Sequence, residues 1–125
     1  MHHLKISLLA ACGLCLFASA CFAAPSSKPQ MRCGWFENPT PGNAWLHDRG
    51  GEWTVAIQGD YEAKGDWPAF KDSQWVNVNG SHGYGCACLK AVVNAKTRKI
   101  LSIIDAKARP LSACRVDRAL KVPVD

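Results

Sequence analysis

Two cysteines in alternate positions, Cys86 and Cys88, are the residues whose types and spacing could most readily do chemistry. The run around them, residues 84–93, has the pattern of a β-strand, in which residues two apart point to the same face, about 6–7 Å from each other. A bond between these two sulfurs would close a tight, strained ring. We therefore predict that Cys33 pairs with one of them and Cys114 with the other; which pairs with which stays open.

Two other kinds of site use the same residues. A soft-metal site would combine Cys86 and Cys88 with His82 and one distant cysteine, which is a loose match to the four ligands that structural zinc requires. A redox dithiol normally lies exposed at the start of a helix, where the thiolate is stabilised, but the flanks here are strand-like. We predict two structural disulfides among Cys33, Cys86, Cys88 and Cys114, no metal ligand and no cofactor.

The histidines His47 and His82 each stand alone in the sequence. A general base needs a positioned partner, and His47 and its neighbour Asp48 fall at a turn, where successive side chains diverge. The sequence has no serine in a nucleophile-elbow pattern and no glycine-rich phosphate loop. We predict no catalytic residue. The alternative is a small envelope enzyme in which either histidine acts with one of three carboxylates, Asp48, Glu37 or Asp66.

Aromatic residues are the unusual feature of the composition. They comprise Trp35, Phe36, Trp45, Trp53, Tyr61, Trp67, Phe70, Trp75 and Tyr84. In a small domain most large rings serve as core, because each buries a great deal of apolar area. Tyr61, Trp67 and Phe70 fall instead in an irregular connection, where rings are better placed to meet a sugar chain or another protein. We predict that these three rings bind a partner.

The elements that position these residues are mostly strands. Trp53, Val55 and Ile57 alternate with smaller or polar residues, so one face of their strand is apolar. We predict a mainly β domain, with α+β as the variant, built on an antiparallel sheet of about five strands and a short C-terminal helix. Strands are expected over residues 32–37, 44–47, 52–58, 75–79, 84–93 and 100–105, and the helix over residues 111–121.

Two further expectations concern side-chain direction and loop length. Strict alternation places Leu101 and Ile103 on one face of their strand and Ile100 and Ile104 on the other. Residues 59–73 form a connection longer than a typical loop. Such a loop is either functional or packed down by its own rings.

The start of the chain has the anatomy of a secretory signal peptide. Residues 6–22 are almost wholly apolar, and small residues precede a cleavage site at Ala24. A lipid anchor at Cys12 or Cys21 is the alternative, which we rank lower because the apolar stretch before Cys12 is too short. The predicted divisions are 1–23 signal peptide, 24–31 disordered leader, 32–121 single disulfide-stabilised domain and 122–125 tail.

Export determines the cysteine count and the charge of the mature chain. Three of the seven cysteines leave with the signal peptide, and an even number remains for an oxidising compartment. The mature chain keeps 14 of the 15 basic residues and all 10 acidic ones, a net charge of +4. The only dense basic group, residues 96–99, is typical of a solvated hairpin turn. We predict a periplasmic or secreted protein with no nucleic-acid partner and no membrane span.

Several motifs resemble those of an uncharacterised family of small exported bacterial proteins, known only as a domain of unknown function. They are Cys-Gly-Trp-Phe-Glu-Asn-Pro-Thr-Pro-Gly-Asn at 33–43, Gly-Asp-Trp-Pro at 65–68, Tyr-Gly-Cys-Ala-Cys at 84–88 and Arg-Pro-Leu-Ser-Ala-Cys-Arg at 109–115. The resemblance covers residues 32–120 and implies one exported disulfide domain. It implies no activity.

These observations favour a non-enzymatic binding or inhibitory module. Its expected partner is a protein or glycan ligand of the cell envelope. The expectation rests on stiff, proline- and aromatic-bearing loops carried by a disulfide-bonded β scaffold.

Overall fold

The computed structural model describes residues 12–19 and 28–123 of the chain. Most of the predicted signal peptide, its cleavage site, much of the predicted leader and the last two residues of the tail therefore lie outside the described residues. The elements are β1 (Gln30–Thr40), β2 (Asn43–Asp48), β3 (Gly51–Ile57), β4 (Tyr61–Glu62), the 3₁₀ turn η1 (Asp72–Gln74), β5 (Trp75–Asn79), β6 (His82–Asn94), β7 (Lys99–Arg109) and α1 (Leu111–Arg115). No helix among the described residues is long and apolar enough to span a membrane.

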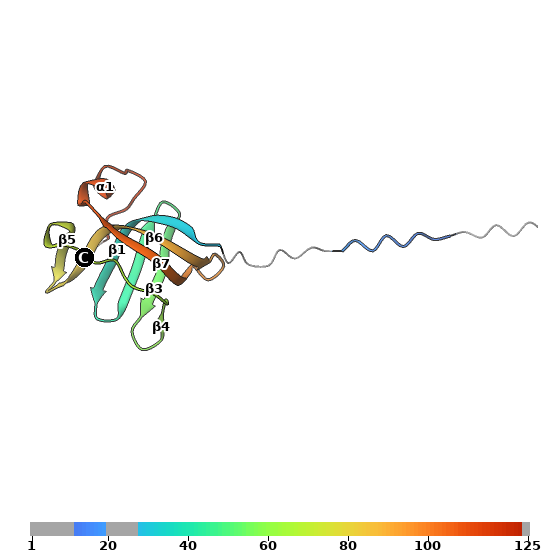
Figure 1. Ribbon diagram of the computed structural model, residues 1–125, viewed down its shortest axis with the longest axis horizontal. Helices are drawn as coiled ribbons and strands as arrows, with labels where there is room; N and C mark the ends of the chain where they lie inside the picture. The colour runs from blue at the N-terminus through green and yellow to red at the C-terminus, as the bar shows by residue number, and fades with distance from the viewer. Residues whose placement is uncertain (1–11, 20–27, 124–125) are drawn as a thin grey trace, which may run out of the picture.

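The strands close into a small barrel. β1 pairs antiparallel with β2 along one edge and with β6 along the other, which its length of 11 residues allows. The strand order β1-β2-β3-β7-β6 thereby returns to β1 (Figure 1). β5 lies outside this ring and pairs with the start of β6, so it forms a free edge.

The barrel is weakest between β3 and β7, which are parallel and share only the pair Thr54 and Lys99. The segment that follows β3 fills this gap. The Ala63 N–H donates to the Val55 carbonyl at 2.8 Å, and Lys64 exchanges backbone hydrogen bonds with β7. Gly65 then turns the chain away with φ +95°, and a Cβ at this position would collide with a β7 carbonyl.

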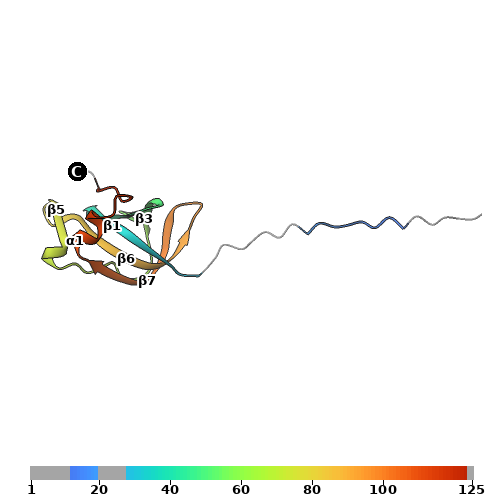
Figure 2. The ribbon, with the colours of Figure 1, turned by 90° about the horizontal axis from the view of Figure 1, so that it is seen from above.

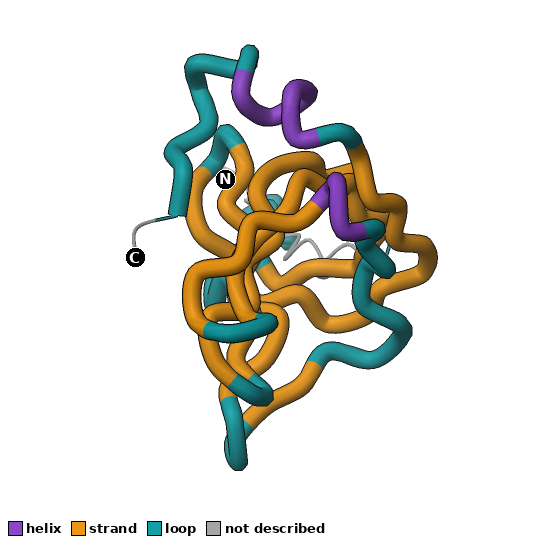
Figure 3. Tube along the Cα trace, turned by 90° about the vertical axis from the view of Figure 1, so that its left-hand side faces the viewer, coloured by secondary structure: helices purple, strands orange, loops and turns teal. Residues whose placement is uncertain are grey.

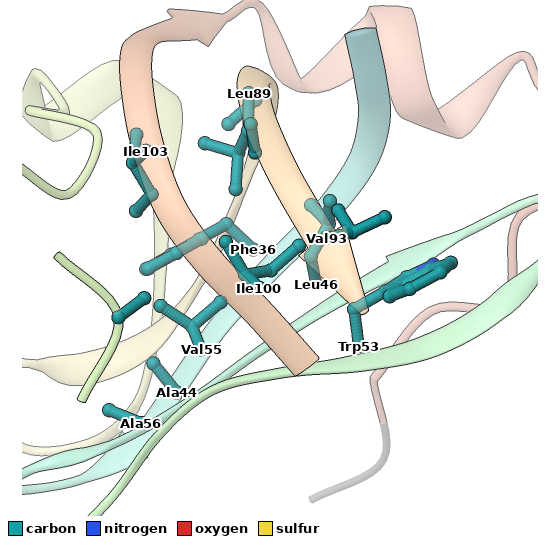
Figure 4. Packing of buried hydrophobic residues seen from close by; sticks show 13 residues of the cluster. Phe36, Ala44, Leu46, Trp53, Val55, Ala56, Leu89, Val93, Ile100 and Ile103 are labelled. Carbon is teal, nitrogen blue, oxygen red and sulfur yellow. The ribbon is translucent and has the colours of Figure 1, made fainter. Parts of the chain in front are cut away.

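The barrel core consists of buried side chains from every strand of the ring. It comprises Phe36, Ala44, Leu46, Trp53, Val55, Ala56, Ala63, Ala87, Leu89, Ala91, Val93, Ile100 and Ile103. Figure 4 shows the aliphatic and aromatic members meeting between the strands. Each strand contributes the alternate residues that face inward, which is why the hydrophobic alternation in the sequence marked the strands correctly.

The prediction of which side chains share a face of β7, with Leu101 beside Ile103 and Ile100 beside Ile104, is wrong. Ile100 and Ile103 are both buried, whereas Leu101 and Ile104 are exposed. The cause is two irregularities in the β6–β7 register, each of which inserts one extra residue into β7. A β-bulge of this kind leaves the extra residue unpaired and resets the alternation after it.

A second cluster lies on the outer face of the barrel. Trp35, Cys86 and Cys114 are buried there, with Tyr84, Leu111, Ala113 and Leu120 packed against them. We call this group the outer cluster. α1 and the residues after it cover this group (Figure 2). The disulfide between Cys86 and Cys114 ties this cover to β6, while Cys33 and Cys88 join the paired strands β1 and β6.

The prediction of a mainly β domain with one short helix and two disulfides is confirmed. The sheet has seven strands where about five were expected, and it is mixed because β3 and β7 run parallel. The helix ends at Arg115, although the sequence predicted it to continue to residue 121. The Asp117 carboxylate accepts the Ala119 N–H at 3.1 Å, and such a local hydrogen bond competes with the helical pattern. Figure 3 shows α1 and η1 as short helical segments in a molecule made of strands and turns.

Candidate functional site

A hollow of about 340 Å³ opens beside β5 and the loop that precedes it. It combines aromatic rings with amide and charged side chains. Its lining comprises Phe36, Asn38, Trp67, Pro68, Phe70, Lys71, Asp72, Trp75, Asn77 and Ser81. We call it the aromatic hollow.

The rings of the aromatic hollow form a continuous row. Phe36 belongs to the barrel core and is 1% exposed. Trp67 meets it edge-on with ring centres 5.7 Å apart, and the Phe70 ring centre lies 6.1 Å from that of Phe36. Phe70 in turn lies 4.8 Å from Trp75. Three half-buried rings are therefore anchored on one another and on the core, and each keeps part of its surface open.

Glycine makes room for this row. A Cβ on Gly85 would come within 2.5 Å of a Phe70 ring carbon and 2.6 Å of the Gln74 carbonyl. A Cβ on Gly83 would collide with the Val76 carbonyl. The two glycines of β6 thus allow both β5 and the loop to approach closely, which gives a physical reason for glycines on both sides of Tyr84.

The polar lining is also held in place. Gln74 accepts the Lys71 N–H through its side chain at 3.0 Å and donates its own N–H to the Lys71 carbonyl at 2.8 Å. Asn38 donates to the carbonyls of Thr40 and Asn43 at 2.9 and 2.6 Å. These bonds fix the positions from which lysine, aspartate and amide groups line the hollow.

The three rings predicted to bind a partner do not all meet. Trp67 and Phe70 line the aromatic hollow, but Tyr61 lines a neighbouring hollow of about 370 Å³. Trp67 borders both. The Tyr61 hydroxyl donates to the Ile100 carbonyl at 2.7 Å, and burial raises the pKa of this phenol. The role of Tyr61, Trp67 and Phe70 in binding a partner stays a prediction.

Sequence reasoning missed Trp75 and the two asparagines of the aromatic hollow, Asn38 and Asn77. Trp75 begins a strand, so its pattern indicated a core position. Its indole N–H donates to the Ser81 carbonyl at 3.0 Å, across the turn that joins β5 to β6. The available signal was its position directly after the long aromatic loop, at a strand that could be an edge.

His47 contacts Glu37, one of the three carboxylates named as a possible partner, whereas His82 contacts an asparagine that was not among them. His47 Nε2 lies 2.7 Å from the Glu37 carboxylate, and its Nδ1 lies 3.8 Å from that of Glu52. His82 Nδ1 lies 3.1 Å from the Asn38 side-chain oxygen. These contacts join neighbouring strands, whose pairing a single sequence does not show. Among residues 12–19 and 28–123, no group of three or more His, Cys, Asp or Glu side chains is arranged to hold a metal ion.

Comparison with known proteins identifies the family. Over residues 27–121 the chain matches DUF4087, described as a protein of unknown function. The match covers most of the chain, so the protein belongs to this family and the expected membership of an uncharacterised domain family is confirmed. No curated protein and no solved structure matches the chain significantly.

Proposed function

We propose that this member of the DUF4087 family is an exported, non-enzymatic binding module that holds a sugar ring of an envelope glycan in its aromatic hollow. The observation that carries the proposal is the row of half-buried rings, Trp67, Phe70 and Trp75, facing one hollow beside fixed amide and charged groups. The neighbouring hollow has two rings, Tyr61 and Trp67, whereas the aromatic hollow has four.

A sugar ring suits this lining for chemical reasons. Its C–H faces are apolar and pack on aromatic rings, while its hydroxyls need hydrogen-bond partners. Asn77 can donate and accept, the Asn38 side-chain oxygen can accept, Lys71 can donate and Asp72 can accept. The volume of about 340 Å³ is within the usual range for small-ligand sites. A concave hollow also fits one ring better than the broad surface of a protein partner.

The structure around the hollow supports binding without large rearrangement. Pro68 restricts Trp67 to extended backbone conformations, and Phe70 is held between two other rings. Ordering the loop before the ligand arrives lowers the entropic cost of binding.

Export is the second part of the proposal. The apolar stretch before Ala24 supports a signal peptide over residues 1–23, and two disulfides are typical of oxidising compartments. On this basis a leader runs from Ala24 to the start of β1 at Gln30, two residues earlier than the sequence predicted, the functional domain continues to residue 121, and residues 122–125 are a tail. The intact mass of periplasmic protein tests it: a chain that starts at Ala24 is expected, and a diacylglyceryl adduct on Cys12 or Cys21 would contradict it.

Titration with soluble tetrasaccharides tests the glycan proposal. We expect tetra-N-acetylglucosamine or cellotetraose to change the tryptophan fluorescence with a Kd below about 1 mM, equivalent to about 4 kcal/mol. Trp67→Ala and Trp75→Ala should lose this response. Trp45→Ala is the matched control, because Trp45 is also half-buried but does not line the hollow. Equal loss in all three variants, or no response in the wild type, would refute the proposal.

A second candidate function, a small envelope enzyme, is favoured by one contact. The 2.7 Å approach of His47 Nε2 to Glu37 resembles the carboxylate that orients a general-base histidine. His47 and Glu52 also line a separate hollow beside Ala119 and Lys121. If this reading is correct, prolonged incubation with tetra-N-acetylglucosamine should release shorter fragments, and His47→Ala should abolish their release. If the wild-type protein leaves the sugar intact, the enzyme alternative is refuted and the binding module remains the proposal.

A further inference from the structure

The two disulfides share β6 but have opposite surroundings. Cys86 and Cys114 are each 2% exposed and lie within the outer cluster. Cys33 is exposed and Cys88 is half-buried, although they join directly paired residues of β1 and β6. Solvent therefore reaches one bridge and is excluded from the other.

We propose that the Cys33–Cys88 disulfide is a site of thiol–disulfide exchange with an external dithiol. The attacking thiolate reaches Cys33 Sγ, and Cys88 leaves as the thiolate. The Cys86–Cys114 disulfide remains closed. This proposal is independent of the glycan-binding function.

Access determines which sulfur is attacked. An incoming thiolate must approach along the axis of the sulfur–sulfur bond, and rates depend on which sulfur it can reach. Cys33 lies near the start of β1, where Met31 is also exposed. Cys88 is flanked by β1 on one side and β7 on the other. The open side of the bridge is therefore the Cys33 side.

Charge determines which sulfur leaves. The Arg109 guanidinium Nη1 lies 3.7 Å from Cys88 Sγ. Lys107 is the β7 residue paired directly with Cys88 and is also exposed. The Asp105 carboxylate lies 3.9 Å from the Lys107 ammonium, and Asp48 and Asp117 line the same hollow as Cys33 and Arg109. Cations beside a sulfur stabilise its thiolate, and reactive cysteines occur in such partly exposed, electropositive surroundings.

The exchange balances without any further reactant. The thiolate of the dithiol forms a bond to Cys33 Sγ, the Cys33–Cys88 bond breaks, and its electron pair leaves on Cys88. The second thiol of the dithiol then attacks the mixed disulfide, which releases Cys33. The dithiol ends as a disulfide, and both cysteines end reduced, each as thiol or thiolate according to pH.

The domain is built to remain folded after this exchange. β1 and β6 keep eight residue pairs besides Cys33 and Cys88, between Gln30 and Asn38 of β1, that do not include the bridge. Cys86–Cys114 still ties the cover to the barrel. The reduced bridge would thus present a surface thiol at Cys33 on a native scaffold, which is what a site of reversible modification requires.

Reduction of the folded protein by dithiothreitol tests the proposal, with free thiols alkylated at intervals and located by peptide mass spectrometry. We expect Cys33 and Cys88 to become labelled at least about tenfold faster than Cys86 and Cys114. The same reaction in guanidinium chloride should remove most of this difference, because unfolding exposes both bridges. Labelling of both bridges at equal rates in the folded protein, or of Cys86–Cys114 first, would overturn the proposal.

The direction of attack and the role of charge need two further measurements. Glutathione, a monothiol, should give a mixed disulfide on Cys33 with a free Cys88; an adduct found mainly on Cys88 would contradict the assignment. Arg109→Gln should slow opening of this bridge about threefold without affecting the other. Lys96→Gln removes the same charge from the exposed β6–β7 turn and is the matched control. Equal rates for both variants would refute the role of Arg109.

Discussion

The barrel core and the outer cluster each bury a tryptophan to the same extent by different means. Trp53 and Trp35 are both 1% exposed. Trp53 packs in the barrel core among residues of paired strands, and the guanidinium groups of Arg32 and Arg98 lie over its ring. Trp35 is covered by a five-residue helix and the turns after it, which depend on one disulfide. Equal burial therefore does not imply that replacing the two tryptophans costs the same free energy of unfolding.

The largest effect that distinguishes the two regions is expected from removing these tryptophans. Trp53→Ala should lower the free energy of unfolding by about 3–5 kcal/mol, because the paired strands beside it cannot collapse into the cavity. It also removes the ring on which the guanidinium groups of Arg32 and Arg98 each lie, at 4.0 Å. Trp35→Ala should lower the free energy of unfolding by less, because the short segment that covers Trp35 can move into the cavity and partly fill it. Urea unfolding of both variants measures the difference.

The half-buried Trp45 supplies the control for this pair, and its replacement by alanine should cost least of the three. A cost for Trp35→Ala equal to that for Trp53→Ala would mean that the cover is as rigid as the barrel, and the comparison would fail.

A slightly smaller effect is expected from removing the disulfide of the cover. Replacing Cys86 and Cys114 by serine together should destabilise the protein by about 3–4 kcal/mol, since the bridge closes a loop of 28 residues. Hydrogen exchange should then accelerate in α1 and the residues after it, while the barrel strands stay protected. The matched variant, with serine at Cys33 and Cys88, should leave exchange in α1 unchanged. Uniform acceleration in all strands would show that the barrel also depends on the cover.

The same contrast explains what the sequence could predict. Strands lining the barrel core alternate between interior and exterior, so alternation located them. Trp53 and Val55 are buried as expected, but Ile57, expected on the same apolar face, is exposed, and Ala56 is buried in its place. Alternation failed at Leu101 and Ile104, because bulges depend on how β6 and β7 pair and leave no local signal. β4 was missed because it consists of only Tyr61 and Glu62, which pair with the end of β3 across a short turn.

The candidate site was less predictable than the fold. The sequence singled out Trp67 and Phe70 because they fall in one loop, but it could not separate them from Tyr61, which lies in a different hollow. Trp75 joins the site only because β5 pairs with the start of β6. The pairing of Cys33 with Cys88 was left open for the same reason, since it follows from the β1–β6 register.

A moderate loss of stability is expected from a substitution in the aromatic hollow, because its rings are half-buried, unlike the fully buried tryptophans of the barrel core and the outer cluster. Trp67→Ala should cost about 1–2 kcal/mol in unfolding experiments, less than Trp53→Ala, because the half-buried ring loses mainly its contact with Phe36. A loss of about 3–5 kcal/mol would instead make Trp67 a core residue and would remove the main support for glycan binding.

The smallest effect concerns the ion pair that joins the cover to the β2–β3 turn. The Asp117 carboxylate accepts hydrogen bonds from two nitrogens of Arg49, each at 2.9 Å. These bonds, with a further one from the Ala119 N–H, hold the pKa of Asp117 below the ordinary value for aspartate. Because the folded pKa is the lower one, the pair stabilises the fold above the ordinary aspartate pKa, and this contribution disappears as the pH falls through the folded pKa. A solvent-exposed pair of this kind contributes little.

NMR titration of the carboxyl groups measures the pKa of Asp117, and hence its pairing with Arg49, without a measurement of overall stability. The midpoint of Asp117 should lie below that of an unpaired aspartate, and Arg49→Gln should raise it towards the ordinary value. Because the pair joins the cover to an exposed turn and not to the paired strands, the same substitution should leave hydrogen exchange in the barrel strands unchanged, while exchange after α1 increases at neutral pH. An unshifted midpoint in the wild type would mean that Cys86–Cys114 and apolar packing hold the cover alone. The cover would then be held by fewer contacts than the structure indicates, and the difference in stability between it and the barrel core would be larger.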